Sequence, residues 1–334
     1  AISGTHIGTV LTVTDQAGKQ RRSIRNGLGQ LTRVDEPTAN GLGAVNTPNQ
    51  PTYYDYDTLN NLKTVKQGGT LFSPEQQRDF QYDSLSRLKS ANNPESGLIQ
   101  YSYDKSGNVT SKTDARGVTT TYAYDALNRF ITKSYSDSTP QITYFYDNLP
   151  NAKGQLIKVS SSVSTTAYTE FDTMGRLKSH KQSTDGEEYE TEYKYNLSGG
   201  MIEQTYPSGR KVKNVIDNDG QLALVKSKKN ANAGYFDYAK SFTYNATGAV
   251  KSMQLGNGKW ESTTFNSRLQ PTQIALGTVQ SGTDKLKLNF DYNTVGQIDN
   301  NGNVLKQTIK VPDTINATGF TAIQSYDYDE LNRL

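Results

Sequence analysis

The chain has 334 residues, a formal net charge of +3 and an apolar share of 33%, and it contains no cysteine. Disulfides, thiolate nucleophiles and cysteine-based metal sites are therefore excluded. The small net charge, with basic residues scattered along the chain, argues against a nucleic-acid partner. Aromatic residues make up 10% of the chain, and 22 of them are tyrosines. This composition favours extended sheets with one solvent-exposed face over a disordered chain.

The sequence also bears on membranes and on chain boundaries. No apolar run approaches the roughly 18 residues that a membrane-spanning helix needs, so we expect no membrane insertion. No signal peptide is visible at Ala1. The sequence stops inside a copy of a repeated motif, and we therefore expect a fragment of a longer chain.

A nine-residue pattern recurs from near the start of the chain to Leu334. It reads aromatic, any residue, aromatic, Asp or Asn, two residues, Gly or Asn, a polar residue, and an aliphatic or aromatic residue, as in Tyr101–Val109 and Tyr122–Phe130. The Asp or Asn serves as the marker of each copy, and Ser23–Leu31 is a degenerate first copy. The markers are Asn26, Asp57, Asp83, Asp104, Asp125, Asp147, Asp172, Asn196, Asp217, Asn245, Asn266, Asn293 and Asp329.

The marker spacing predicts a repeat architecture. Asp83, Asp104 and Asp125 lie 21 residues apart (104 − 83 and 125 − 104), and larger spacings elsewhere indicate insertions. One such period holds two strands and two turns, which is the turn spacing of an all-β protein. No helical period is sustained anywhere. The repeat therefore predicts one array over residues 1–334.

The residues of one copy have distinct expected roles. Tyr101 and Tyr103 are two residues apart, so on a strand they project from the same face. The Asp104 side chain can bond backbone amides two residues on and so start a turn. Gly107 tolerates the positive φ that tight hairpins require. The following strand returns and turns again at Arg116-Gly117.

Three segments depart from the basal unit. Residues 35–52 are rich in Pro, Gly and Asn and are expected to form a long loop. Residues 299–320 are expected to hold a turn, a strand over 304–311 and a second loop. Ser73–Gln76 carries helix-capping residues, which leaves a single helical turn or a hairpin tip as alternatives. The motif resumes on both sides of 35–52 and 299–320, so we expect irregular insertions rather than linkers.

The pattern Tyr-x-Tyr-Asp-x-Leu/Gly-Asn-Arg-Leu resembles the signature of the YD, or rearrangement-hotspot (Rhs), repeat family. The resemblance covers residues 23 to 334 and is strongest at Tyr54–Leu62, Phe80–Leu88, Tyr101–Val109, Tyr122–Phe130 and Tyr326–Leu334. The residues assigned to the structural repeat motif are Tyr54, Tyr56, Asp57, Phe80, Tyr82, Asp83, Tyr101, Tyr103, Asp104, Gly107, Tyr122, Tyr124, Asp125, Tyr144, Tyr146, Asp147, Tyr193, Tyr195, Asn196, Phe242, Tyr244, Asn245, Tyr326, Tyr328 and Asp329.

The resemblance implies an all-β fold in which antiparallel hairpins lie side by side in a curved, spiralling sheet, a YD-repeat shell or part of one. Family members include bacterial polymorphic toxins, C components of insecticidal toxin complexes and teneurins. It further implies a structural, non-enzymatic segment of a secreted or cell-surface protein, of bacterial origin and without a cofactor. The partner would be the rest of its own chain, with a C-terminal toxin enclosed or presented.

An extracellular adhesin is the alternative, with glycans or a surface protein as partners of the repeats. Family members that release a toxin by self-cleavage use aspartates in an Asp-Pro-x-Gly context. This sequence has no Asp-Pro dipeptide, so that activity is carried over to no residue here. Open sheet edges would also allow self-association.

Other residues that could carry chemistry have simpler interpretations. His6 and His180 are far apart in sequence and are expected at ordinary strand or surface positions. Asp217–Gly220 and Asp299–Asn303 resemble the start of a calcium loop but lack its spaced Glu, and a turn is favoured. The carboxylate pairs Asp55/Asp57 and Asp327/Asp329 resemble a glycosidase arrangement, but the repeat accounts for them.

The tyrosines form the last candidate feature. If neighbouring hairpins pair in register, Tyr101 and Tyr103 are expected to stack beside Tyr122 and Tyr124, each aromatic pair contributing roughly 0.2–1 kcal/mol. A structural role for this ladder is favoured over contact with a ligand. No catalytic or metal-binding residue is predicted, and no ligand-binding residue is assigned.

Overall fold

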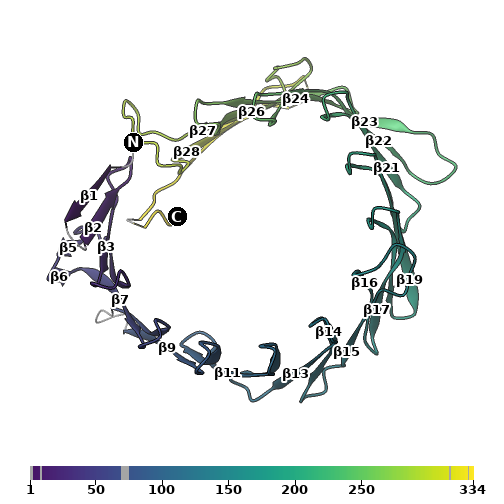
Figure 1. The fold of residues 1–334 in the computed structure, drawn as a ribbon. Helices are drawn as coiled ribbons and strands as arrows, with labels where there is room; N and C mark the ends of the chain where they lie inside the picture. The colour runs from purple at the N-terminus through teal and green to yellow at the C-terminus, as the bar shows by residue number, and fades with distance from the viewer. Residues whose placement is uncertain (1–2, 8–9, 69–74, 316, 330) are drawn as a thin grey trace. The chain divides into compact units, whose positions relative to one another are not determined.

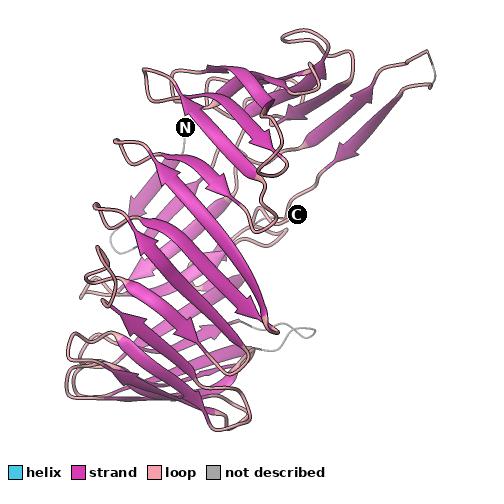
Figure 2. Ribbon diagram, turned by 90° about the vertical axis from the view of Figure 1, so that its right-hand side faces the viewer, coloured by secondary structure: helices cyan, strands magenta, loops and turns pink. Residues whose placement is uncertain are grey.

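A computed structural model of the chain describes residues 3–7, 10–68, 75–315, 317–329 and 331–334. In this part of the chain the secondary structure is entirely strands, turns and loops, without a helix (Figure 2). No helix long and apolar enough to cross a membrane occurs there. The predicted all-β architecture of antiparallel hairpins lying side by side is confirmed.

The chain divides into two compact units. The first contains residues 1–142, 292–303 and 326–334, and within it the strands follow a curved path (Figure 1). Its strands are β1 (Ser3–Ile7), β2 (Val10–Thr14), β3 (Gln20–Arg25), β4 (Leu31–Glu36), β5 (Gly43–Ala44), β6 (Thr47–Pro48), β7 (Gln50–Tyr56), β8 (Leu62–Gln67), β9 (Gln76–Tyr82), β10 (Leu88–Asn93), β11 (Gly97–Tyr103), β12 (Val109–Thr113), β13 (Thr119–Tyr124) and β14 (Phe130–Tyr135).

The second unit contains residues 143–291 and 304–325. Its strands are β15 (Ile142–Tyr146, whose first residue belongs to the first unit), β16 (Leu156–Ser160), β17 (Ser164–Phe171), β18 (Leu177–Thr184), β19 (Glu187–Tyr195), β20 (Met201–Thr205), β21 (Lys211–Ile216), β22 (Leu222–Lys228), β23 (Phe236–Tyr244), β24 (Val250–Leu255), β25 (Trp260–Phe265), β26 (Pro271–Gly277), β27 (Leu286–Asp291), β28 (Lys306–Val311) and β29 (Phe320–Ser325).

Strands that follow one another in the chain pair antiparallel. In the first unit this order runs from β1 to β14, except that β4 pairs with β7 and the small β5–β6 pair lies between them. Antiparallel order makes β9, β11 and β13 run in the same direction. The motif turns that follow these strands therefore lie along one edge of the sheet.

In some strands residues alternate between a covered and an open face. In β11, Leu98, Gln100 and Ser102 are exposed, whereas Ile99 and the tyrosines are half-buried. Among the described residues, the buried apolar side chains are few and mostly small: Val34, Leu42, Ala91, Ala152, Phe171, Ala239 and Ala275. The buried side chains are therefore scattered along the sheet, and each is covered mainly by its neighbouring strands.

The two expected insertions contain short regular elements. Residues 35–52 hold the β5–β6 pair and the start of β7, so this segment is more ordered than a simple loop. In 299–320 the predicted strand begins at Lys306 rather than Val304. The segment Ser73–Gln76 lies partly outside the described residues, and Gln76 opens β9.

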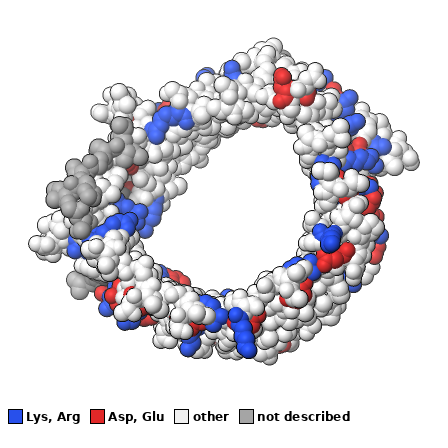
Figure 3. Space-filling model, in the orientation of Figure 1, with Lys and Arg blue, Asp and Glu red and all other residues white. Residues whose placement is uncertain are grey.

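Charged side chains of both signs are interspersed over the visible face of the molecule (Figure 3). Several pairs join neighbouring strands, as between Lys194 and Glu203 at 2.8 Å and between Lys306 and Asp291 at 2.7 Å. This mixture agrees with the formal net charge of +3.

Candidate functional site

The turn at Asp125 shows how one repeat is closed. The Asp125 Oδ1 atom accepts hydrogen bonds from the backbone N–H groups of Leu127 at 2.8 Å and Arg129 at 3.0 Å. The N–H of Asn128 donates to the Asp125 carbonyl, and Asn128 has a φ of 60°. The register shifts between Ala123 and Tyr124. Together these features make a type I turn followed by a left-handed residue and a bulge.

The same side-chain cap recurs along the chain. In each case the marker oxygen Oδ1 accepts from the N–H groups two and four residues further on. The residues that do so are Asp15, Asn26, Asp57, Asp83, Asp104, Asp114, Asp125, Asp172, Asp217, Asn245, Asn266 and Asp329. Asp15 and Asp114 are caps that the nine-residue pattern does not mark.

Two predicted markers form different turns. At Asp147 the loop is longer, because the Asp147 N–H donates to the carbonyl of Gln155 at 3.2 Å and its Oδ1 accepts from Gly154. Near Asn293 the turn bond runs from the Gln297 N–H to the Thr294 carbonyl at 2.9 Å. Asp147 thus caps a longer loop, and the turn near Asn293 begins one residue later, at Thr294.

The residue four after the marker completes the cap with its side chain. Arg129 Nε donates to Asp125 Oδ2 at 2.8 Å, and Asn108 Nδ2 donates to Asp104 Oδ2 at 2.9 Å. Arg and Asn at this position thus satisfy the carboxylate oxygen that the backbone leaves over. Asn61, Arg87, Arg176 and Arg333 make the same contact.

The second aromatic residue of a motif joins its repeat to the one before. The Tyr124 hydroxyl donates to the Val109 carbonyl at 2.8 Å, and the Tyr103 hydroxyl donates to the Leu88 carbonyl at 2.7 Å. In both cases the acceptor is the residue that ends the preceding motif. Tyr56 with Leu31 and Tyr244 with Leu222 repeat the arrangement.

Arginine at the fourth position after the marker also contacts the following repeat. Arg87 Nη1 donates to the Asp104 carbonyl at 3.0 Å, and its guanidinium lies 4.7 Å from the ring centroid of Tyr103. Arg176 makes the equivalent pair with Asn196 and Tyr195. One side chain therefore caps its own turn and stacks on the next motif, which lysine could not do in the same geometry.

The expected stacking of tyrosines between neighbouring hairpins is wrong. Strand β12 lies between β11, which carries Tyr101 and Tyr103, and β13, which carries Tyr122 and Tyr124. The rings instead pack within a hairpin: Tyr124 and Phe130 have centroids 4.8 Å apart. Besides the backbone pairing of their strands, repeats are joined through Tyr hydroxyls and Arg side chains.

The caps change the acidity of the turn aspartates. The Asn108 side-chain amide chiefly holds the pKa of Asp104 below its ordinary value. For Asp83 and Asp125 the main cause is the backbone N–H four residues on, with the Arg side chain adding to it. Burial raises the pKa of the Tyr103 and Tyr124 hydroxyls, which keeps them as donors.

A buried ionic cluster was not predicted from the sequence. Asp35 on β4 is fully buried, and its Oδ2 accepts from Arg22 Nε at 2.6 Å and from Arg33 Nη2 at 3.1 Å. Arg22 also donates to the carbonyls of Gly43 and Ala44, which form β5. The cluster therefore holds the 35–52 insertion against the sheet. The only signal for this cluster would have been the strand register that places Arg22 of β3 opposite Asp35 of β4.

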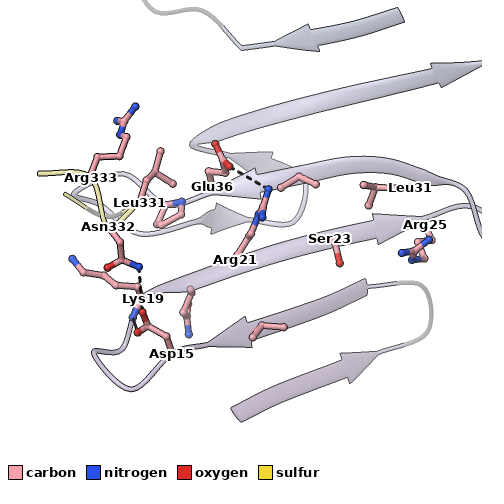
Figure 4. Close-up of a pocket in the computed structure, with 14 residues that line it drawn as sticks. Asp15, Lys19, Arg21, Ser23, Arg25, Leu31, Glu36, Leu331, Asn332 and Arg333 are labelled. Carbon is pink, nitrogen blue, oxygen red and sulfur yellow. Dashed lines mark hydrogen bonds and ion pairs between the residues drawn. The ribbon is translucent and has the colours of Figure 1, made fainter. Parts of the chain in front are cut away.

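A pocket of ≈ 650 Å³ lies in the first unit (Figure 4). Residues of β2, β3 and β4 line it together with the turn at Leu331–Arg333. Its walls combine apolar side chains with charged ones of both signs. The lining residues are Val13, Asp15, Lys19, Gln20, Arg21, Ser23, Arg25, Leu31, Val34, Glu36, Pro37, Leu331, Asn332 and Arg333.

The remaining candidates for chemistry lie in strands and turns of the two units. His180 on β18 stacks on Tyr193 with centroids 5.8 Å apart, and His6 lies in β1 of the other unit. Asp217–Gly220 forms a capped turn of the kind described above. Within the described residues, no group of three or more acidic, His or Cys side chains could hold a metal ion.

Residues 103–140 match the family model described as RHS Repeat. This segment carries an Rhs repeat. The matched segment begins at Tyr103 and contains the complete motif at Asp125, and the predicted Rhs/YD-repeat resemblance is thus confirmed. No curated protein sequence matches the chain.

Solved structures share the fold of this chain. The TcdB2–TccC3 structure without its hypervariable C-terminal region matches with a TM-score of 0.83 at 17% identity, over 99% of this chain and 18% of that one. The TcdB2–TccC3–Cdc42 structure gives 0.82 at 17%, with the same coverages. A Tc holotoxin pore from Photorhabdus luminescens gives 0.81 at 16%, again with the same coverages. The chain thus spans 18% of the length of these proteins.

Proposed function

We propose that the chain is a structural wall segment of a larger, secreted or cell-surface Rhs protein of bacterial origin, which encloses or presents a C-terminal toxin. The observation that carries the proposal is the fold likeness over 99% of the chain to a protein solved without its hypervariable C-terminal region. The contacts between repeats support it, because the Tyr103 hydroxyl and the capping Arg87 each join one hairpin to the next. The segment itself would be non-enzymatic.

The same proposal covers the organisation of the chain. Residues 1–334 form one Rhs array within a longer protein, and 35–52 and 299–320 are insertions into it. The motif tyrosines and markers named above have a structural role in this array. Its partner is the rest of its own chain, and it needs no cofactor.

Limited proteolysis of the complete natural protein tests the enclosure. The segment that follows the array should be cleaved much more slowly than the same segment expressed alone. Tyr103→Ser and Tyr124→Ser together should weaken the wall and speed that cleavage. Equal cleavage rates of the enclosed and isolated segment would refute enclosure while leaving the Rhs fold untouched.

A glycan-binding surface is a second candidate, favoured by an exposed aromatic cluster on the second unit. The exposed fractions are 41% for Tyr235, 50% for Phe236 and 40% for Tyr238. The Phe236 and Tyr238 rings lie 4.9 Å apart beside a pocket of ≈ 460 Å³ that Leu255 and Asn257 also line. Exposed rings next to a few polar groups are typical of ligand sites.

A glycan array probed with the 334-residue chain tests this alternative. Phe236→Ser with Tyr238→Ser should abolish any specific signal. Tyr53→Ser is the matched control, because Tyr53 is 44% exposed but lies in the first unit. Absence of signal from the unmodified chain, or equal loss in the control, would count against glycan binding.

A further inference from the structure

Successive capped turns are placed in the same register relative to one another. Between the Asp104 and Asp125 turns, Ser111 pairs with Thr121, seven residues after one marker and four before the next (111 − 104 and 125 − 121). The same offsets relate the marker pairs Asn26 and Asp57, Asp57 and Asp83, Asp83 and Asp104, Asp172 and Asn196, Asn196 and Asp217, and Asn245 and Asn266. Equivalent residues of neighbouring turns are therefore placed alike in these pairs.

Short amide side chains connect two of these pairs of turns. Asn108 Nδ2 donates to Asn128 Oδ1 at 2.8 Å, and Gln30 Nε2 donates to Asn60 Oδ1 at 2.6 Å. In both cases the donor is four residues after its marker, and the acceptor is an Asn three residues after the next marker. Asn60 and Asn128 have φ values of 66° and 60°. The Asn thus takes the left-handed position of its turn and also presents an amide oxygen to the repeat before.

Arginine connects two other pairs without a side chain at that position. Arg87 and Arg176 donate to the backbone carbonyls of the next markers, and their guanidinium groups stack on the tyrosines just before those markers. The left-handed residue of the following turn is Gly107 in one case and Gly199 in the other. The longer Arg side chain therefore needs only the backbone and the ring of the next motif.

The remaining pairs in this register lack both combinations. Their residues four after one marker and three after the next are Asn61 with Ser86, Gly200 with Gly220, and Ala249 with Leu269. In the described part of the chain no hydrogen bond joins the two residues of any of these pairs. Identical strand register alone thus does not produce the contact.

Asn61 has the donor for such a contact but not the acceptor. Its Nδ2 donates to Asp57 Oδ2 at 2.9 Å, just as Asn108 Nδ2 donates to its own marker at 2.9 Å. An amide nitrogen carries two hydrogens, so one is left for the next turn. Asn108 donates it to Asn128, whereas the following turn of Asn61 carries Ser86, which is left-handed with a φ of 59°.

We propose that the side chain four residues after a marker, where it is Asn, Gln or Arg, recognises the repeat that follows. Asn and Gln are specific for a turn with Asn at its left-handed position, and Arg is specific for the tyrosine and carbonyl of the next marker. These contacts select which hairpins fit side by side, beyond the backbone pairing that any antiparallel strand offers. The selection requires no enclosed cargo and so stands apart from the function proposed above.

Ser86→Asn in the 334-residue chain tests the amide rule by adding the missing acceptor. The free N–H of Asn61 should donate to the introduced oxygen and lower the local opening constant of β7–β10 by about two- to tenfold, the usual effect of one hydrogen bond. Amide hydrogen exchange measures this constant. Adding Asn61→Ala should remove the gain, and a gain that persists would overturn the rule.

Two further variants provide the controls. Gly220→Asn introduces the same residue at an equivalent turn position, where a Cβ atom meets nothing within 4 Å, but the preceding Gly200 has no side chain to donate. Replacing Gly200 with Ala should leave its effect unchanged. In the native pair, the effects of Asn108→Ala and Asn128→Ser should be coupled by about two- to tenfold. Independent effects at Asn108 and Asn128 would contradict recognition through the amide.

An exchange of one contact for the other tests the arginine rule. Arg87→Gln should increase the opening constant of β10 and β11, because Gly107 offers no amide oxygen to glutamine. Adding Gly107→Asn should restore protection, since this combination matches Gln30 with Asn60. If Gly107→Asn had the same effect with Arg and with Gln at position 87, the two residues would not act as a matched pair.

A crystal structure of the Ser86→Asn variant gives a readout that needs no second substitution. Asn61 Nδ2 should lie about 2.7–3.2 Å from the introduced amide oxygen, the range of an N–H···O hydrogen bond. A separation beyond about 3.5 Å in the folded variant would overturn the proposal. Circular dichroism establishes that each variant keeps the β spectrum of the parent before exchange is measured.

Discussion

At the scale of single residues, the Tyr hydroxyl explains why the repeat uses tyrosine at its second aromatic position. The Tyr124 ring packs on Phe130 within its own hairpin, while its hydroxyl donates to the Val109 carbonyl of the repeat before. Phenylalanine could supply only the first contact. The other position, Tyr122, also contacts Phe130, with centroids 5.6 Å apart.

Replacing Tyr124 with Phe should therefore lower the free energy of unfolding by about 0.5–1.5 kcal/mol, the usual net contribution of one hydrogen bond. Urea denaturation followed by circular dichroism measures the change. Tyr122→Phe is the control, because it keeps the ring contact, and it should change stability less. Equal effects of the two substitutions would show that the hydroxyl of Tyr124 has no special role.

The capped aspartates make stability depend on pH in the acid range. The pKa values of Asp83, Asp104 and Asp125 are lowered in the folded chain by hydrogen bonds to the carboxylate. A lowered folded pKa stabilises the folded state above the unfolded value of about 4, and this stabilisation is lost as pH falls through the folded values.

The urea midpoint should therefore fall as pH is lowered below the unfolded pKa of about 4 and through the lower folded pKa values of these carboxylates. Asp104→Asn should flatten that dependence, because asparagine does not titrate. Asparagine serves as the marker in native copies such as Asn245, where its Oδ1 makes both backbone bonds. A variant with the unmodified pH profile would contradict the assignment of the transition to the caps.

The sequence is most informative about the turns, because each is closed by local contacts. Asp104 and Gly107 could be assigned to a turn since an Asp side chain and a residue of positive φ have few alternatives. Leu269 shows the limit of this logic: its φ is 62°, although the pattern calls for Gly or Asn there. Its marker Asn266 accepts from the N–H groups of Arg268 and Gln270, and this cap holds leucine in the left-handed region.

At the scale of elements, the register between strands determines side-chain contacts that the sequence motif does not predict. The motif alone places Tyr101 and Tyr122 at equivalent positions, but a returning strand, β12, separates them. The Asp35 cluster depends on register in the same way. Nothing local distinguishes Asp35 from a solvent-facing aspartate until β3 places Arg22 opposite it.

Asp35→Asn should destabilise the first unit by about 3–5 kcal/mol, because it leaves the buried Arg22 guanidinium and the half-buried Arg33 guanidinium without their counter-charge. It should also free the β5–β6 pair, since Arg22 contacts the carbonyls of Gly43 and Ala44. Denaturation and amide hydrogen exchange over residues 37–49 would measure the two effects. Asp55→Asn, at an exposed position of β7, is the control. An unchanged exchange pattern in the Asp35 variant would show that the cluster does not hold the insertion.

At the scale of the whole molecule, contacts between strands follow chain order. The strand pairings of the described residues join sequence neighbours, apart from the β4–β7 pair that spans the insertion. Few large side chains are buried among the described residues, so no central core in that part of the chain couples distant repeats. Stability should then be the sum of local and nearest-neighbour terms, as in other repeat proteins.

Gly256→Ala tests this nearest-neighbour coupling. A Cβ atom at Gly256 would lie 2.2 Å from the Asp237 carbonyl oxygen, so β23 and β24 must move apart, at a cost of about 1–3 kcal/mol. Gly234→Ala is the matched control, since a Cβ there meets nothing within 4 Å. Amide hydrogen exchange in the Gly256 variant should lose protection in β22–β25 and keep it in β9–β12. A uniform loss of protection over both units would instead require a single cooperative core, because only a shared core can carry a local disturbance to strands that do not touch it.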